Sequence, residues 1–173
     1  MAFQNFVNKH KDRDYSTVYD NDRGGTIVCE EEGKKYSYIY SSNETFLRIH
    51  VDGGLVKDES SRKCDFLLLN TTEQWSKTLE SNFHAIFIEL KGKNIQKARE
   101  QLLATIDKYD GELLGSKLYA RIVASEINFK RSAPMNPVEQ PYKTKSSKVT
   151  CFFKCVSKTM TEHTGRDGNP TRK

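Results

Sequence analysis

The sequence of 173 residues lacks several features that mark membrane and secreted proteins. It contains no apolar run approaching the roughly 20 residues that a membrane-spanning helix needs. Its first 20 residues are polar and charged, unlike a secretory signal peptide. Four cysteines without an export signal do not suggest a disulfide framework. These absences predict an intracellular, cytoplasmic protein with no membrane partner.

Common catalytic motifs are also missing. The chain has no nucleophile-elbow pattern, no glycine-rich phosphate loop and no HExxH zinc motif. Cys151, Cys155 and His163 offer three zinc ligands, whereas a structural zinc site uses four. His50 and His84 lie in or beside predicted strands, where a surface or structural role is expected. The sequence therefore disfavours a zinc site and predicts no catalytic histidine.

Basic residues are concentrated toward the end of the chain. The protein has 28 Lys and Arg against 23 Asp and Glu, a formal net charge of +5. Residues 141–173 alone carry +6, so the remainder is close to neutral. A near-neutral body with a basic segment is typical of a protein that binds a polyanion. A solvated tail that aids solubility has the same pattern.

Apolar patterning predicts a mixed α/β domain. Two continuous apolar runs indicate central strands covered on both faces, and a helix with Asn94 as N-cap follows them at residues 94–109. Glu32-Gly33-Lys34 indicates a hairpin turn. The predicted strands cover residues 26–30, 36–40, 46–51, 64–69, 85–90 and 117–125.

The chain is divided into three parts by these patterns. Residues 1–23 form an N-terminal segment with a weak helical signal, and residues 24–130 form the core. Residues 131–173 combine a proline-containing loop with the basic C-terminal segment. Within that last part, the short apolar run at residues 149–156 indicates an edge strand or packed segment, and residues 162–173 are predicted to be disordered.

Each of the two apolar strands carries one carboxylate, Asp65 or Glu89. A carboxylate on a central strand is costly unless it is paired, hydrogen-bonded or bound to metal. Glu89 and Lys91 are two residues apart and share one face of their strand, while Leu90 faces the core. If the two strands are neighbours, Asp65 joins them at the solvent edge. Carboxylate oxygens suit Mg²⁺ or Mn²⁺, and a nearby lysine offsets charge on a phosphate.

The order of acid-bearing strand, Glu89-Leu90-Lys91 strand and helix resembles the PD-(D/E)XK nuclease superfamily. The resemblance covers roughly residues 46–125 and implies the restriction-endonuclease-like fold, a central mixed β-sheet flanked by helices, here with a basic C-terminal extension. It implies that Asp65, Glu89 and the backbone carbonyl of Leu90 bind the metal. It also implies that Lys91 is the catalytic lysine and that Gln101 reaches toward the site from the helix.

The sequence departs from the family pattern in two places. A Lys-Cys pair stands where a proline often precedes the aspartate. Members often carry a further acid on an earlier helix, and Glu44, Glu30, Glu31 or no residue can correspond to it. The turn sequence Glu32-Gly33-Lys34 also matches E-x-K, but no acid-bearing strand precedes it.

The resemblance implies a metal-dependent nuclease that hydrolyses phosphodiester bonds, most readily in DNA, with Mg²⁺ or Mn²⁺ as cofactor. A homodimer would suit cleavage of both strands of a duplex. The alternative is a non-catalytic nucleic-acid-binding or regulatory subunit with a nuclease-like fold. A third hypothesis is an unrelated interaction protein in which Glu89 and Lys91 form a surface ion pair. The residues predicted to bind the nucleic-acid backbone are Lys130, Arg131, Lys143, Lys145 and Lys148.

Overall fold

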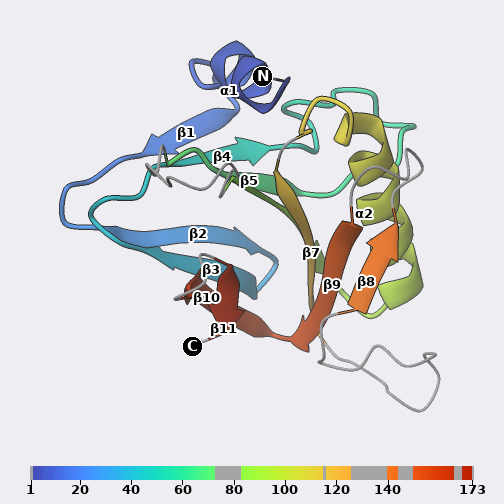
Figure 1. Ribbon diagram of the computed structural model, residues 1–173. Coiled ribbons are helices and arrows are strands. Elements are labelled where there is room, and N and C mark those ends of the chain that lie inside the picture. The colour runs from blue at the N-terminus through green and yellow to red at the C-terminus, as the bar shows by residue number, and fades with distance from the viewer. Residues whose placement is uncertain are drawn as a thin grey trace.

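The computed structural model describes residues 2–72, 83–114, 116–125, 140–143, 150–165 and 169–172. These residues form a mixed α/β structure with two β-sheets and two helices (Figure 1). No helix in this part of the chain is long and apolar enough to cross a membrane.

The larger sheet has seven strands in the order β1-β4-β5-β6-β7-β9-β8. Strands β1, β4, β5 and β6 pair antiparallel, β7 and β9 run parallel to β6, and β8 is antiparallel to β9. The sheet is therefore mixed, as the resemblance implies, but helices cover one of its faces and the second sheet covers the other. Its strands are β1 (Ser16–Tyr19), β4 (Phe46–His50), β5 (Phe66–Asn70), β6 (His84–Lys91), β7 (Lys117–Ala124), β8 (Gln140–Lys143) and β9 (Thr150–Ser157).

A second sheet of four strands has the order β11-β10-β3-β2. Its strands are β2 (Gly25–Glu31), β3 (Lys34–Tyr40), β10 (Thr159–Thr164) and β11 (Pro170–Arg172). Strand β3 pairs antiparallel with β2 and parallel with β10, and it packs against β6 and β7 of the larger sheet. The turn between β2 and β3 consists of Glu32 and Gly33, both with positive φ (46° and 73°), which confirms the predicted hairpin.

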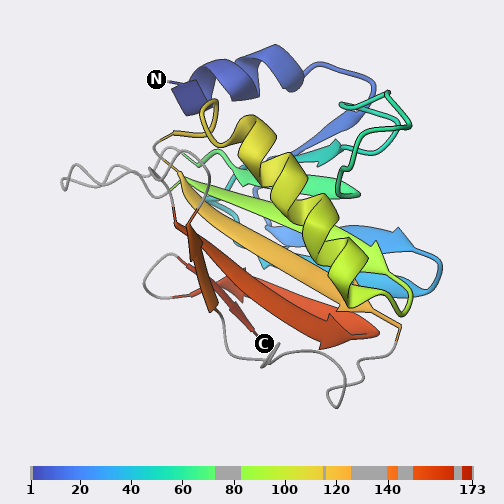
Figure 2. The same cartoon turned by 90° about the vertical axis from the view of Figure 1, so that its right-hand side faces the viewer.

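Helix α2 (Ile95–Tyr109) connects the parallel strands β6 and β7 and lies across one face of the larger sheet (Figure 2). It begins at Asn94, whose side chain accepts a hydrogen bond from the Lys97 amide at 2.9 Å. The buried stripe Ala98, Leu102 and Ile106 holds α2 on the sheet. Helix α1 (Ala2–His10) contributes further apolar residues to the same side of the core.

Both faces of the larger sheet are buried. Leu67 and Phe87 belong to the core beneath the helices, whereas Leu68 and Ile88 belong to the core shared with the smaller sheet. This double coverage explains the two continuous apolar runs, because every side chain of a central strand then needs to be apolar. Glu89 is two residues beyond Phe87, so its side chain extends to the face that carries α2.

Three observations in the C-terminal part differ from the sequence predictions. Strand β9 lies inside the larger sheet, between β7 and β8, and is not an edge strand. The edge strand is β8, which contains Pro141 where the sequence predicts a loop. Strands β10 and β11 occupy much of the segment predicted to be disordered. All three depend on pairing between segments far apart in the chain, which local patterning does not reveal.

Candidate functional site

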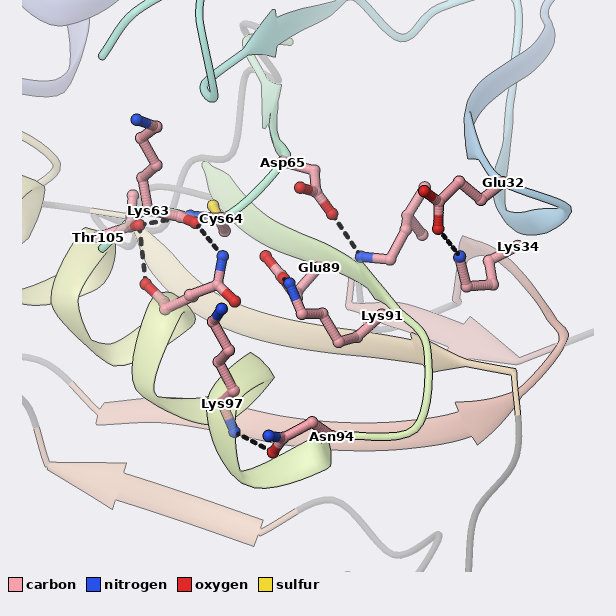
Figure 3. A network of polar contacts seen from close by, with 12 residues as sticks. Glu32, Lys34, Lys63, Cys64, Asp65, Glu89, Lys91, Asn94, Lys97 and Thr105 are labelled. Carbon is pink, nitrogen blue, oxygen red and sulfur yellow. Dashed lines mark hydrogen bonds and ion pairs between the residues drawn. The ribbon is translucent and has the colours of Figure 1, made fainter. Parts of the chain in front are cut away.

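The site lies where β5 begins and β6 ends. The antiparallel register pairs Phe66 with Ile88, so Asp65 and Glu89 are the next neighbours across the two strands. Asp65 Oδ2 accepts a hydrogen bond from the Leu90 amide at 2.6 Å, which fixes the aspartate against β6. The two strands are adjacent, and the structure therefore brings together the two carboxylates that the sequence singles out (Figure 3).

Glu89 is the most unusual residue of the site. Its side chain is 0% exposed, and Lys91 Nζ lies 3.4 Å from its Oε1 as an ion pair. Neither carboxylate oxygen of Glu89 has a hydrogen bond within the described residues. Lys91 is 27% exposed, so its ammonium reaches solvent while staying beside the buried acid. A buried carboxylate with one weak partner is costly for the fold and is suited to receive a cation.

Burial dominates the electrostatics of both acids. Burial, followed by the charge of Asp65, raises the pKa of Glu89 to about 8, against the lowering effect of Lys91. Burial also raises the pKa of Asp65 to about 7, although the Leu90 amide and Lys91 favour its ionised form. Without a cation, the pair therefore holds protons near neutral pH that a bound metal would displace.

Helix α2 holds the segment that carries Asp65. Gln101 Nε2 donates a hydrogen bond to the Lys63 carbonyl at 2.9 Å. Thr105 Oγ1 accepts from the Cys64 amide at 2.8 Å and donates to the Gln101 carbonyl at 2.9 Å (Figure 3). The two residues before Asp65 are thus tied to one face of the helix. Gln101 Oε1 is buried and has no hydrogen bond among the described residues.

Thr105→Val is expected to destabilise the protein by about 1–3 kcal/mol, because the isosteric change leaves the buried Cys64 amide without an acceptor. Thermal unfolding measures the loss as a decrease in Tm. The control is Thr26→Val, which makes the same change at an exposed position of β2 and should leave Tm nearly unchanged. Equal Tm values for the two variants would show that Thr105 does not hold this segment.

The donor set fits a small, hard divalent cation. Asp65 and Glu89 offer carboxylate oxygens, and Mg²⁺ is usually held by one or two carboxylates together with waters and a substrate phosphate. Among the described residues, no group of three or more His, Cys, Asp or Glu side chains converges into a complete metal cage. The remaining ligands would have to come from a backbone carbonyl such as that of Leu90, from water and from substrate.

Three acids were candidates for a further metal ligand on the basis of the sequence, and the structure places them in different surroundings. Glu44 is buried away from the carboxylate pair, where it accepts hydrogen bonds from the Ser41 amide and the Thr164 hydroxyl. Glu30 lines a cavity of about 480 Å³ on the other side of β5. The exposed Glu31 is the member of the three whose charge raises the pKa of both site carboxylates.

Other residues that the sequence singled out lie elsewhere. Glu32 and Lys34 form an ion pair at 3.0 Å across the β2–β3 turn, with Glu32 exposed and Lys34 buried, so the second E-x-K match is a local contact of that turn. Lys143 is the last residue of the edge strand β8. Lys130, Arg131, Lys145 and Lys148 lie outside the described residues. Sequence reasoning missed Thr105, because a threonine inside an amphipathic helix carries no signal of its long-range partner.

No family model, curated protein or solved structure matches this chain. A functional assignment therefore depends on the geometry and chemistry of the site. The strongest feature is a pair of neighbouring carboxylates with raised pKa values at the end of two central strands, with a lysine beside them.

Proposed function

We propose that the protein is a metal-dependent nuclease that hydrolyses phosphodiester bonds, with DNA as the favoured substrate. The observation that carries this proposal is the fully buried Glu89, which lacks hydrogen bonds within the described residues, neighbours Asp65 and lies 3.4 Å from Lys91. Such an arrangement has little structural use by itself, because an apolar residue at position 89 would pack at lower cost. A cation-binding role explains why two acids occupy this place.

The path of the chain around the site supports the restriction-endonuclease-like fold. Strands β4, β5 and β6 form an antiparallel meander, α2 follows, and β7 then runs parallel to β6. Asp65 precedes the middle strand of this meander, and Glu89-Leu90-Lys91 ends the third. This is the order of elements that the resemblance to PD-(D/E)XK nucleases implies.

Each side chain has a role in this proposal. Asp65 and Glu89, with the Leu90 carbonyl, would hold Mg²⁺ or Mn²⁺. When bound, such an ion polarises a phosphate and lowers the pKa of a coordinated water. Lys91 places its ammonium at the solvent edge of the pair, where it offsets negative charge that develops on the phosphate. Gln101 positions the Lys63 carbonyl and thereby the segment that carries Asp65.

Cleavage of labelled single-stranded, double-stranded and branched DNA, and of RNA, tests the proposal in Mg²⁺ or Mn²⁺ against EDTA. Lys91→Ala is expected to lower the rate by about 10²–10³-fold, because the variant loses a fixed positive charge at the developing phosphate charge. The matched control is Lys93→Ala, which removes the same charge two residues further along at an exposed position. It should change the rate only a few-fold.

Two results would contradict the proposal. Equal rates for folded Lys91→Ala and wild type would remove the lysine from the mechanism. Binding of nucleic acid without metal and without cleavage of any substrate would favour the alternative, a non-catalytic nucleic-acid-binding or regulatory subunit. Circular dichroism of each variant separates both results from simple loss of fold.

A further inference from the structure

Charge is distributed unevenly around the carboxylate pair. On the side of α2, the basic residues Arg62, Lys63 and Lys97 line cavities beside the helix. Three acids, Asp52, Glu59 and Glu100, line the same cavities. On the side of the β2–β3 turn stand the exposed acids Glu31 and Glu32. Figure 3 shows Lys97 and Glu32 on opposite sides of Glu89. A chain of phosphates passing the site therefore meets balanced charges that include the exposed Lys97 on the α2 side, and an excess of carboxylates at the turn.

Two adjoining cavities lie on the α2 side. They have volumes of about 290 and 350 Å³, and Arg62, Lys97 and Gln101 line both of them. Gln101 connects these cavities to the candidate site, because it is hydrogen-bonded to the Lys63 carbonyl two residues before Asp65. One of the two cavities thus reaches Lys63, two residues before the candidate metal ligand Asp65.

The basic residues of this side differ in how far their charge is already neutralised. Arg62 pairs with Glu100 at 3.1 Å, and Lys63 pairs with Asp52 at 3.3 Å. The exposed Lys97 has no ion pair within the part of the chain that the structure describes. Its ammonium can therefore bind an incoming anion without breaking an existing contact.

The opposite side is electrostatically unfavourable for a phosphate. Glu31 is exposed at the end of β2 and is followed directly by Glu32 in the turn. Glu32 is partly offset by Lys34, with which it forms an ion pair at 3.0 Å, but it stands 80% exposed at the turn. A nucleic-acid backbone crossing this turn would meet both of these carboxylates.

We propose that the substrate strand extends from the carboxylate pair over the first turns of α2, and that Lys97 binds the phosphate next to the scissile one. This inference rests on the proposed function, since it takes the scissile phosphate to lie at Asp65 and Glu89. The acidic β2–β3 turn bounds the opposite side and disfavours continuation of the backbone there. Lys97 is thus a substrate-binding residue that the nuclease resemblance does not imply.

The test compares Lys97→Ala with Lys108→Ala. Both lysines are exposed residues of α2, and they are eleven residues apart, so they lie on nearly the same helix face about 16 Å from one another. Affinity for a labelled single-stranded oligonucleotide is measured over a salt series, in EDTA and separately in Ca²⁺. Thermal unfolding checks that both variants are folded.

Lys97→Ala is expected to weaken binding by roughly 3- to 10-fold at low salt and to reduce the slope of log Kd against log salt by about 0.7–0.9. Lys108→Ala should change neither quantity. Glu31→Gln should strengthen binding slightly, because it removes a repulsive charge. Equal affinities for the two lysine variants, or no binding by wild type in either buffer, would overturn the inference.

Failure of this inference can be told apart from failure of the proposed function. Metal-dependent cleavage that requires Glu89 but is equally insensitive to Lys97→Ala and Lys108→Ala would leave the nuclease in place and disprove the phosphate site. A specific loss of binding in Lys97→Ala, with no cleavage by wild type in any metal, would support the phosphate site and contradict the nuclease. If both hold, Lys97→Ala should raise KM more than it lowers kcat.

Discussion

Glu89→Gln is expected to abolish metal-dependent cleavage and, in the metal-free protein, to increase thermal stability. The substitution removes one of two carboxylates from the candidate metal site while keeping the shape of the side chain. Loss of several kcal/mol of transition-state stabilisation corresponds to a rate decrease of about 10³-fold or more. The measurement is the single-turnover cleavage rate at saturating Mg²⁺, with Mg²⁺ affinity determined separately by calorimetry.

The gain in stability follows from the pKa of Glu89, which burial raises from its ordinary value near 4.5 to about 8. Between about pH 4.5 and pH 8, Glu89 holds a proton in the folded protein that it has released in the unfolded chain. Stability from this group is therefore fully present below about pH 4.5 and is lost as pH rises through about 8. Asp65 acts in the same direction, because burial raises its pKa to about 7.

Glutamine cannot ionise, so the variant should lack the part of this pH dependence that Glu89 supplies. In EDTA, we expect its Tm to match wild type near pH 4 and to exceed it by about 5 °C near pH 8. Added Mg²⁺ should raise the Tm of wild type and leave that of the variant nearly unchanged. Glu32→Gln makes the same substitution in the E-x-K match of the β2–β3 turn, and it should neither lower the cleavage rate nor raise Tm at pH 8.

A lower Tm for Glu89→Gln than for wild type across this pH range would mean that the Glu89–Lys91 ion pair stabilises the fold. The acid would then be structural. Retention of metal-dependent cleavage in the variant would have the more serious consequence, since it would remove Glu89 from the catalytic site altogether.

The largest loss of stability is expected for Glu162→Ala. Glu162 on β10 and Arg121 on β7 are both 0% exposed, and their ion pair measures 2.8 Å between Arg121 Nε and Glu162 Oε2. The Tyr36 hydroxyl donates to the same carboxylate oxygen at 2.9 Å. Removing the acid leaves a buried guanidinium without this charge partner, which costs about 3–5 kcal/mol. Thermal unfolding should show a decrease in Tm of about 10 °C.

Lys9→Ala is the matched control, because it breaks the exposed ion pair with Glu112, at 3.7 Å, and should change stability by less than about 1 kcal/mol. A double variant, Arg121→Met with Glu162→Leu, should recover much of the loss, since an apolar pair of similar volume needs no desolvation of charge. If Glu162→Ala and Lys9→Ala lower Tm equally, the buried network does not hold the two sheets together.

Local sequence patterns were sufficient for the central part of the fold. The six predicted strands correspond to β2, β3, β4, β5, β6 and β7 within two residues at each end. Helix α2 begins after its predicted N-cap, Asn94. These elements follow from side-chain periodicity, capping and turn chemistry, all of which act between residues close in the sequence. The same local geometry places Glu89 and Lys91 on one face of β6.

Local sequence patterns did not predict all strands of the smaller sheet. Strand β10 contains Thr159, Thr161, Glu162 and Thr164, a polar stretch that has no apolar alternation to mark it as a strand. It pairs with β3, more than 120 residues earlier, and buries Glu162 against Arg121. A buried ion pair looks like two ordinary surface charges in the sequence, because its stability depends on a partner that only the folded chain brings near.

Some features of the candidate site follow from local sequence patterns, and others arise only in the folded chain. Residue spacing alone determined that Glu89 and Lys91 share a face and that Asp65 is an acid at the start of an apolar strand. Only the tertiary structure decided that β5 and β6 are neighbours and that Thr105 and Gln101 hold the segment before Asp65. It also placed Lys97 and Glu32 on opposite sides of Glu89 (Figure 3). Periodicity is a property of short stretches of chain, whereas burial, pKa and charge complementarity arise between segments that meet only after folding.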